Sequence, residues 1–128
     1  MPKQSRVMVC VTGQLTCERL IRAGAELAKK EAAELSVVHV SHMNQSFLGN
    51  PMEGEALEYL FAISKEFGAD MTLLRDDNIL GALVNHARKI GATHVVMGVS
   101  GQRGESDFSY ALHAALPHVQ VFVEHTGL

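Results

Sequence analysis

The chain has 128 residues, of which 47% are hydrophobic and 20% charged, and its formal net charge at pH 7 is −3. These values fit one folded globular domain and exclude a disordered chain. The weak acidic balance gives no electrostatic signature for nucleic acid, and no apolar run has the length of a membrane span, so we expect neither partner. The N-terminus has no signal-peptide core, which leads us to expect a cytoplasmic location.

The two cysteines form neither a CxxC pair nor a disulfide framework. Cys10 lies in an apolar run, and we expect it to be a small buried hydrophobic residue. Cys17 is expected in the first turn of a helix, where the helix dipole lowers a thiol pKa. A redox role for Cys17 therefore stays open.

Strand and helix patterns alternate along the chain. Apolar runs rich in β-branched residues predict five strands, at residues 6–12, 35–40, 70–75, 93–97 and 119–124. Helical periodicity predicts four helices, at residues 17–33, 52–67, 79–90 and from about 107 to 116. Within the second of these, one apolar face is expected to hold Leu57, Leu60, Phe61 and Phe67.

Short polar residues precede the last two predicted helices. Asp76 or Asp77 is expected to cap the third helix, and Ser106 or Asp107 the last one. The alternation itself predicts an α/β fold, a single three-layer domain over residues 1–128 with a five-stranded parallel sheet and helices on both faces. With the strand order 3-2-1-4-5, the ligand crevice lies at the carboxyl ends of the first and fourth strands.

The run from Thr93 to Asp107, THVVMGVSGQRGESD, is the most informative stretch. A buried strand is expected to break at Gly98 into a loop that contains Ser100, Gly101 and Gly104. Glycine-rich loops of this kind bring backbone N–H groups and a helix N-terminus close to an anion. The alternative is that these glycines only make a flexible connection. Because the loop follows the fourth strand, where the architecture places a ligand, we favour the phosphate-binding reading.

The chain resembles the universal stress protein family along essentially its whole length. The resemblance rests on RVMVCVT, ERLIRAGAELA, NILGALVNHARKIGATHVVMGVSG and VQVFVE, and the first helix is most similar to the stress-protein module of KdpD-type sensor kinases. It implies an adenine nucleotide alpha hydrolase-like fold and a signalling domain that is usually homodimeric and has no established catalysis. The family resemblance also implies binding of an adenine nucleotide: ATP, AMP or cyclic di-AMP.

Nucleotide-binding members resemble one another in the pattern G-x2-G-x9-G-[S/T], and this chain departs from it. Gly98 and Gly101 match the first two glycines, but alignment from Pro117 puts Ser106-Asp107 at the Gly-Ser position. A carboxylate there would repel a phosphate, and Thr12 stands where the family has an acidic residue. The predicted ligand contacts are Val11, Thr12, Gly13, Val38, Met97, Gly98, Ser100, Gly101, Arg103 and Ser106.

The departure leaves a second reading open, in which the chain is a nucleotide-free dimeric interaction module with a degenerate loop. Hydrolysis of a nucleotide is a third reading, but no base or metal-binding carboxylate is placed near the loop, so we expect no enzyme activity. His39 and His42 have the spacing H-x-x-H without a third ligand, which favours surface histidines over a metal site. No metal is therefore predicted.

The last predicted strand, Val119 to Glu124, would leave one edge of the sheet unpaired. An exposed edge of this length is a liability in a monomer. Pairing with the same strand of a second copy resolves it, and the family resemblance implies such a homodimer. The alternative is that the final residues, EHTGL, cover the edge.

Overall fold

The computed structural model describes residues 5–11, 17–41, 51–99 and 105–125. These ranges contain the strands β1 (Arg6–Val11), β2 (Glu34–Ser41), β3 (Asp70–Arg75), β4 (His94–Val99) and β5 (Gln120–His125). They also contain the helices α1 (Cys17–Glu31), α2 (Pro51–Glu66), α3 (Ile79–Ile90) and α4 (Glu105–Ala115). Strands and helices alternate as the sequence predicts, and the differences lie at their boundaries.

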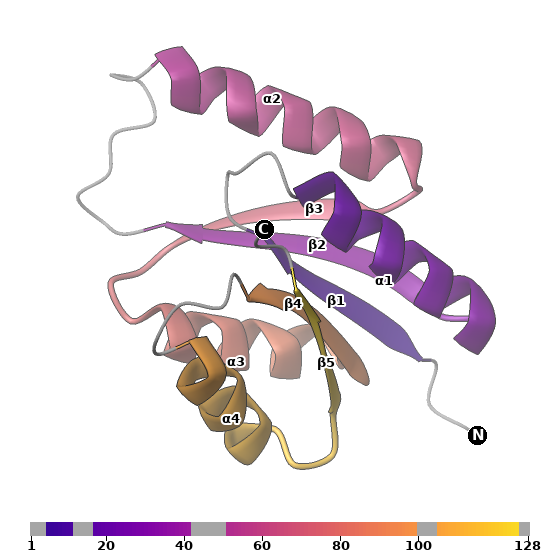
Figure 1. Cartoon of the computed structure of the whole chain (residues 1–128), viewed down its shortest axis with the longest axis vertical. Coiled ribbons are helices and arrows are strands. Elements are labelled where there is room, and N and C mark those ends of the chain that lie inside the picture. The colour runs from indigo at the N-terminus through magenta and orange to yellow at the C-terminus, as the bar shows by residue number, and fades with distance from the viewer. Residues whose placement is uncertain (1–4, 12–16, 42–50, 100–104, 126–128) are drawn as a thin grey trace.

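The strands form one parallel sheet in the order β3-β2-β1-β4-β5. Figure 1 shows α1 and α2 on one face of this sheet and α3 and α4 on the other. The chain steps from β1 to β3 in one direction and from β4 to β5 in the other, and right-handed crossovers then put the two helix pairs on opposite faces. The predicted fold class and strand order are confirmed.

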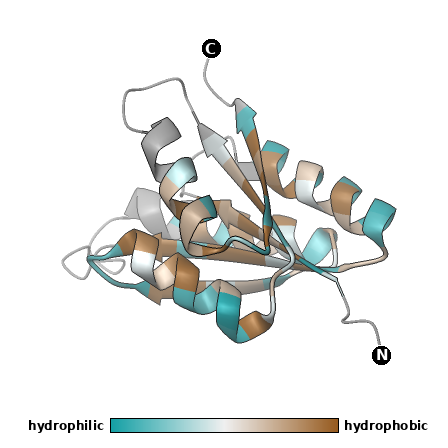
Figure 2. Cartoon of the chain, turned by 90° about the horizontal axis from the view of Figure 1, so that it is seen from below, coloured by the Kyte–Doolittle hydropathy of each residue, from teal (hydrophilic) through white to brown (hydrophobic). Residues whose placement is uncertain are grey.

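Each face of the sheet has its own apolar core (Figure 2). Under α1 and α2, valines of β1 and β2 pack against Leu20, Ile21 and Leu60, whose side chains are almost completely buried. Helix α1 lies very close to β1, since an ideal Cβ at Gly24 would come within 2.3 Å of Val9 Cγ2. Glycine at this position allows the close approach.

Both predicted helix caps are wrong. Helix α3 is capped by Asn78, whose Oδ1 accepts a hydrogen bond of 2.9 Å from the Gly81 N–H, whereas Asp76 Oδ1 accepts one from Asn78 N–H. Asn caps as well as Asp does, and Asp76 instead stabilises the turn that precedes the cap. Helix α4 begins at Glu105, so Ser106 and Asp107 lie in its first turn rather than at its cap.

Two further expectations need correction. Phe61 is 44% exposed, because the inner face of α2 follows the spacing of Leu60, Ile63 and Ser64. Gly98 does not break its strand: β4 continues to Val99, and Gly98 pairs with Glu124 of β5. Pairing with a neighbouring strand here outweighs the low intrinsic strand propensity of glycine.

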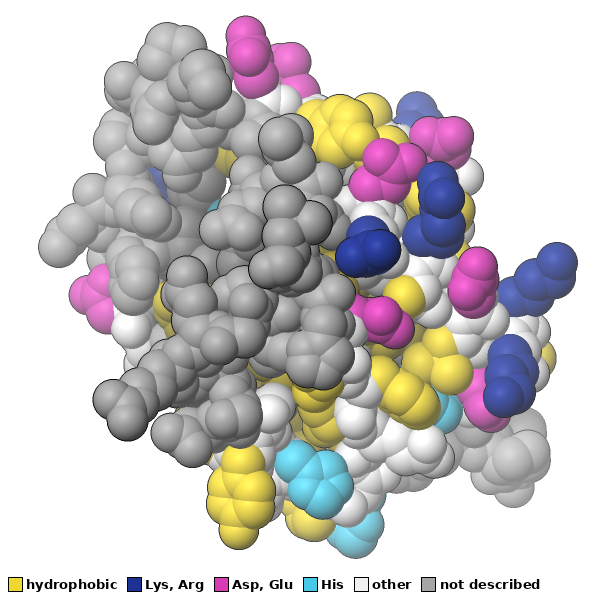
Figure 3. Space-filling model, viewed as in Figure 1, with side chains coloured by type: hydrophobic (Ala, Val, Ile, Leu, Met, Phe, Trp, Pro, Cys, Tyr) yellow, Lys and Arg dark blue, Asp and Glu magenta, His cyan; other side chains and the backbone are white. Residues whose placement is uncertain are grey.

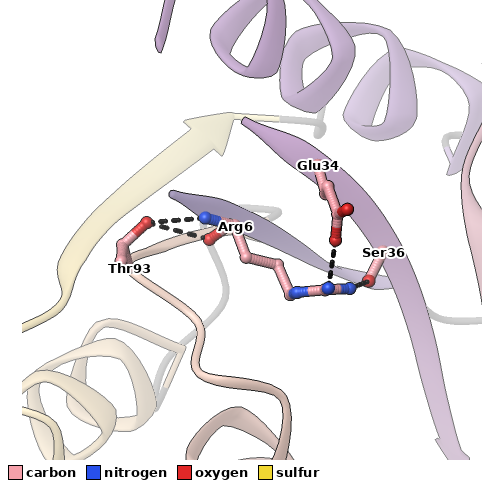
Figure 4. Close-up of polar contacts among 4 residues, drawn as sticks. All are labelled: Arg6, Glu34, Ser36 and Thr93. Carbon is pink, nitrogen blue, oxygen red and sulfur yellow. Dashed lines mark hydrogen bonds and ion pairs between the residues drawn. The ribbon is translucent and has the colours of Figure 1, made fainter. Parts of the chain in front are cut away.

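The amino ends of β1, β2 and β4 together form what we call the amino edge. They are marked by Arg6, Glu34 and Thr93 (Figure 4). Thr93 Oγ1 accepts a 2.9 Å hydrogen bond from Arg6 N–H and lies 3.1 Å from Arg6 O. The Arg6 guanidinium pairs with Glu34 and donates to Ser36 Oγ at 3.1 Å. Side chains thus join three neighbouring strands where their backbone ladder begins.

Acidic and basic side chains are interspersed on the face drawn in Figure 3, where neither sign forms a large patch. Along α1, for example, Glu18 and Arg22 form an ion pair one helical turn apart. Among the described residues, no helix is both long enough and apolar enough to cross a membrane.

Candidate functional site

The candidate site lies at the carboxyl ends of β1, β2 and β4, which we call the carboxyl edge and which end at Val11, Ser41 and Val99. Strands β1 and β4 are neighbours, with Cys10 paired to Met97. The connection after β1 leads to α1 on one face, and the connection after β4 leads to α4 on the other. Diverging connections of this kind open a crevice in a parallel α/β sheet.

Three predicted contact residues belong to the core beside this edge. The exposed fractions of Val11, Val38 and Met97 are 4%, 0% and 7%. Val38 pairs with Cys10 on one side and Thr72 on the other, so its backbone lies inside the ladder. Val11 packs in the core under α1 and α2, whereas Val38 and Met97 pack in the core under α3 and α4. Contacts from Val11 and Met97 to a ligand would therefore have to come from the backbone.

Of the remaining predicted contacts, five fall outside the described residues: Thr12, Gly13, Ser100, Gly101 and Arg103. Gly98 is in the penultimate position of β4 and is partly buried, and Ser106 lies in the first turn of α4. The structure therefore brings together Val11, Met97 and Gly98 at one edge of the sheet.

His39 is the residue of this edge that sequence reasoning missed. It pairs in register with Val11, it is only 9% exposed, and its Nδ1 lies 2.9 Å from the Val11 carbonyl oxygen. The expectation of a surface histidine is therefore wrong for His39. The signal was present, since β2 reads as a continuous apolar run and every side chain of such a strand faces one of two covered surfaces.

Cys10 lies one row inside the edge, on the face covered by α3 and α4. Burial raises the pKa of its thiol from 9.0 to about 12. The thiol is therefore protonated at neutral pH. Cys10 is only partly buried, so the expectation of a buried residue is met in part. The side chain of Cys17 is outside the described part, so its redox role stays a prediction.

Two hollows are lined by described residues, and the second of them reaches Glu124, which pairs with Gly98. One, of about 420 Å³, lies between the ends of α1 and α2 and is lined by Lys29, Leu35 and Phe67, among others. The other, of about 250 Å³, lies between α1 and β5 over Val96 and Phe122. Neither is lined by the predicted contacts. The described residues contain no cluster of three or more histidine, cysteine, aspartate or glutamate side chains that could hold a metal ion.

Comparison with known proteins identifies the family. The model of the universal stress protein family matches residues 4–111. The chain belongs to the universal stress protein family. The sensor protein KdpD of Mycobacterium tuberculosis is 35% identical over 98 residues, which are 76% of this chain and 11% of the relative. The chain therefore spans about a tenth of that relative, and the similarity relates this universal stress protein domain to the corresponding module of KdpD.

Solved structures of the family share the fold at low sequence identity. A universal stress family protein from Burkholderia pseudomallei has a TM-score of 0.68 at 22% identity, with 94% of this chain and 95% of that chain covered. A universal stress protein in complex with cAMP scores 0.64 at 21% identity, covering 96% and 98%. One from Archaeoglobus fulgidus in complex with dAMP scores 0.61 at 17% identity, again covering 96% and 98%.

Proposed function

We propose that this universal stress protein domain is a signalling module that binds an adenine nucleotide at the carboxyl edge, between β1 and β4. The observation that carries the proposal is the adjacency of β1 and β4, whose connections leave toward opposite faces of the sheet. Ligands of open parallel sheets bind at such a switch point. The two nucleotide complexes among the structural neighbours support the choice of ligand class.

In this proposal the backbone of Val11 to Gly13 borders the nucleoside. The segment from Gly98 to Gly101 supplies N–H groups to the phosphate, with Arg103 and Ser106 beside it. Asp107 belongs to the first turn of α4, close in sequence to this segment, and in this proposal its negative charge acts on the phosphate. Such a charge opposes a triphosphate more than a monophosphate, so we propose the order AMP or a cyclic nucleotide over ATP, with cyclic di-AMP as a further candidate.

The proposal includes no catalysis. Binding a nucleotide through backbone donors requires neither a general base nor a metal, and the residues proposed as contacts supply neither. The domain acts by changing its contacts with a partner when nucleotide is bound. The pool of nucleotide that it would sense is cytoplasmic, and we place the domain there as part of the same proposal.

The alternative is a nucleotide-free homodimeric module, and the outer strand β5 would supply its dimer contact. Strand β5 pairs with β4 alone among the described strands, and Phe122 and Val123 are 37% and 39% exposed. We propose that β5, which covers most of the predicted range Val119 to Glu124, pairs with its copy in a second chain. An exposed strand with apolar side chains is stabilised by such pairing. This homodimer is compatible with either function.

Thermal unfolding with millimolar AMP, cAMP, cyclic di-AMP or ATP tests the function. Saturation at about a hundredfold over Kd stabilises the native state by about 2.7 kcal/mol, which raises Tm by several degrees. We expect Gly101→Asp to abolish the shift, because it puts a side chain and a negative charge into the proposed phosphate segment. His118→Asp is the matched control, since it adds the same charge at an exposed residue two positions before β5.

A shift that survives in Gly101→Asp would move the ligand away from this segment. No shift with any of the four nucleotides would contradict nucleotide binding. Together with a dimer mass by light scattering, that result would establish the nucleotide-free module instead.

A further inference from the structure

We propose that His39 determines which nucleoside this domain accepts. Its Nε2 atom would accept a hydrogen bond from a donor of the ligand, either the amino group of adenine or a ribose hydroxyl. This inference rests on the proposed nucleotide site, and it adds a residue that neither the glycine pattern nor the strand ends indicated.

The position of His39 places its ring beside the site. His39 lies on the same face of β2 as Leu35 and Val37, the face that α1 and α2 cover, and opposite Val11, where β1 ends. The connection to α1 starts directly after Val11. A side chain at this point borders both the apolar core below and the proposed nucleoside position above.

The contact with Val11 selects the tautomer of the neutral ring. A carbonyl oxygen can only accept a hydrogen bond, so the 2.9 Å contact requires that His39 Nδ1 carries the proton. In the neutral imidazole, Nε2 is then an acceptor. The same contact holds the ring plane, and the direction of the Nε2 lone pair is set by the fold.

The Nε2 atom has no hydrogen-bond partner among the described residues, although His39 is more than nine-tenths buried. Buried polar side-chain atoms of native proteins nearly always have a partner. An oriented acceptor that no described residue satisfies, beside the switch point of the sheet, fits a ligand donor. Two donor groups of an adenine nucleoside have this chemistry, and ligand analogues distinguish them.

Two substitutions separate the two nitrogen atoms of the ring. His39→Asn keeps an N–H donor near the position of Nδ1 and removes Nε2, so the tie to Val11 stays. His39→Gln keeps a polar atom near the position of Nε2 and loses the donor to Val11. If His39 only held β1 and β2 together, it would need the donor at the position of Nδ1. If His39 recognises the ligand, it needs the acceptor at the position of Nε2.

Isothermal titration calorimetry compares AMP with IMP, which lacks the amino group, and with 2′-deoxy- and 3′-deoxy-AMP. We expect wild type to bind one of these three analogues about tenfold more weakly than AMP, as the loss of one hydrogen bond implies. His39→Asn should bind AMP and that analogue equally while its Tm stays near that of wild type. His39→Gln should keep part of the preference despite a lower Tm.

The wild-type protein provides a second measurement that does not depend on a variant. In ¹⁵N-labelled protein, the imidazole Nε2 resonance of His39 should move when AMP is added and move less with the disfavoured analogue. Equal affinities of wild type for all four nucleotides, or an unchanged preference in His39→Asn, would overturn the role of His39 and leave the nucleotide site intact. Absence of any binding to wild type would overturn both.

Discussion

The two edges of the sheet differ in how their polar groups are used. At the amino edge, Thr93 and the Arg6 side chain bridge neighbouring strands through hydrogen bonds that lie within the protein. At the carboxyl edge, the described side-chain contact between strands is the one from His39 to the Val11 carbonyl, and the ring nitrogen beyond it has no partner among the described residues. The polar groups of the amino edge stabilise the fold, and we propose that those of the carboxyl edge serve a ligand.

This difference follows from the architecture. In a parallel sheet every strand begins at the same edge and ends at the opposite one, so both edges present backbone groups that the ladder does not use. Side chains at the amino edge can stabilise the fold without occupying a ligand crevice, because the diverging connections that form a crevice follow the carboxyl ends. The comparison predicts that substitutions at the amino edge change stability and leave ligand binding unchanged.

The largest expected effect at the amino edge is that of Thr93→Val. The substitution keeps the shape of the side chain but removes the hydroxyl that accepts from Arg6 N–H and contacts Arg6 O and His94 Nδ1. Arg6 N–H would lose this partner in a partly buried position, which costs about 2 kcal/mol of unfolding free energy. Urea denaturation measures the loss, and titration with AMP should give an unchanged Kd.

Thr93→Ser is the control, because it restores the hydroxyl without the methyl group and should recover most of the stability. A change of Kd by more than about tenfold in Thr93→Val would show that the two edges are energetically coupled, which would refute the division of roles drawn here.

A smaller effect is expected from pH, through Cys10 near the carboxyl edge. Its pKa is raised from 9.0 to about 12 in the folded protein. A group with a raised folded pKa contributes its full stability below the unfolded pKa, and this contribution falls as the pH rises from about 9 toward 12. Between pH 8 and pH 10 the loss for this one thiol is about 1 kcal/mol.

Urea denaturation at the two pH values, with Cys10→Ala as the control, isolates the thiol from the other groups that titrate in this range. The variant should lose about 1 kcal/mol less than wild type does. Identical losses in the two proteins would show that the thiol ionises as readily in the native state as in the unfolded one, and thus that this part of the carboxyl edge is open to water.

The sequence predicts the elements of this fold well because each depends on local patterns. Continuous β-branched runs and intervening 3.6-residue periods define the alternation, and the alternation restricts the strand order. The errors fall where contacts distant in sequence decide. Gly98 stays in β4 because β5 pairs with it. Helix α1 ends before Ala32, which has a φ of 53°, and an alanine in the sequence does not indicate a positive φ.

The candidate site is predicted less completely. The adjacency of β1 and β4 places Val11, Met97 and Gly98 together as expected. The apolar run of β2 indicates that His39 is buried, but neither its type nor the spacing H-x-x-H shows what its ring contacts. Only the register of β2 on β1 shows that its ring contacts Val11. The contacts assigned to residues 12–13 and 100–103 stay predictions.

The smallest effect expected at the amino edge is that of Glu34→Gln. The substitution removes the charge that faces Arg6, but the two side chains are 49% and 26% exposed, so water screens the pair. We expect a loss of about 0.5 kcal/mol in low salt and none in 1 M NaCl, measured by urea denaturation. Glu31→Gln removes the same charge from the exposed end of α1 and is the control. A loss in Glu34→Gln above 2 kcal/mol that persists in high salt would mean that the ion pair is the main stabilising side-chain contact of this edge. The expected small loss would leave the Thr93 hydroxyl as the main contact, since it accepts a hydrogen bond from the backbone N–H of Arg6 and so links the start of β4 to β1.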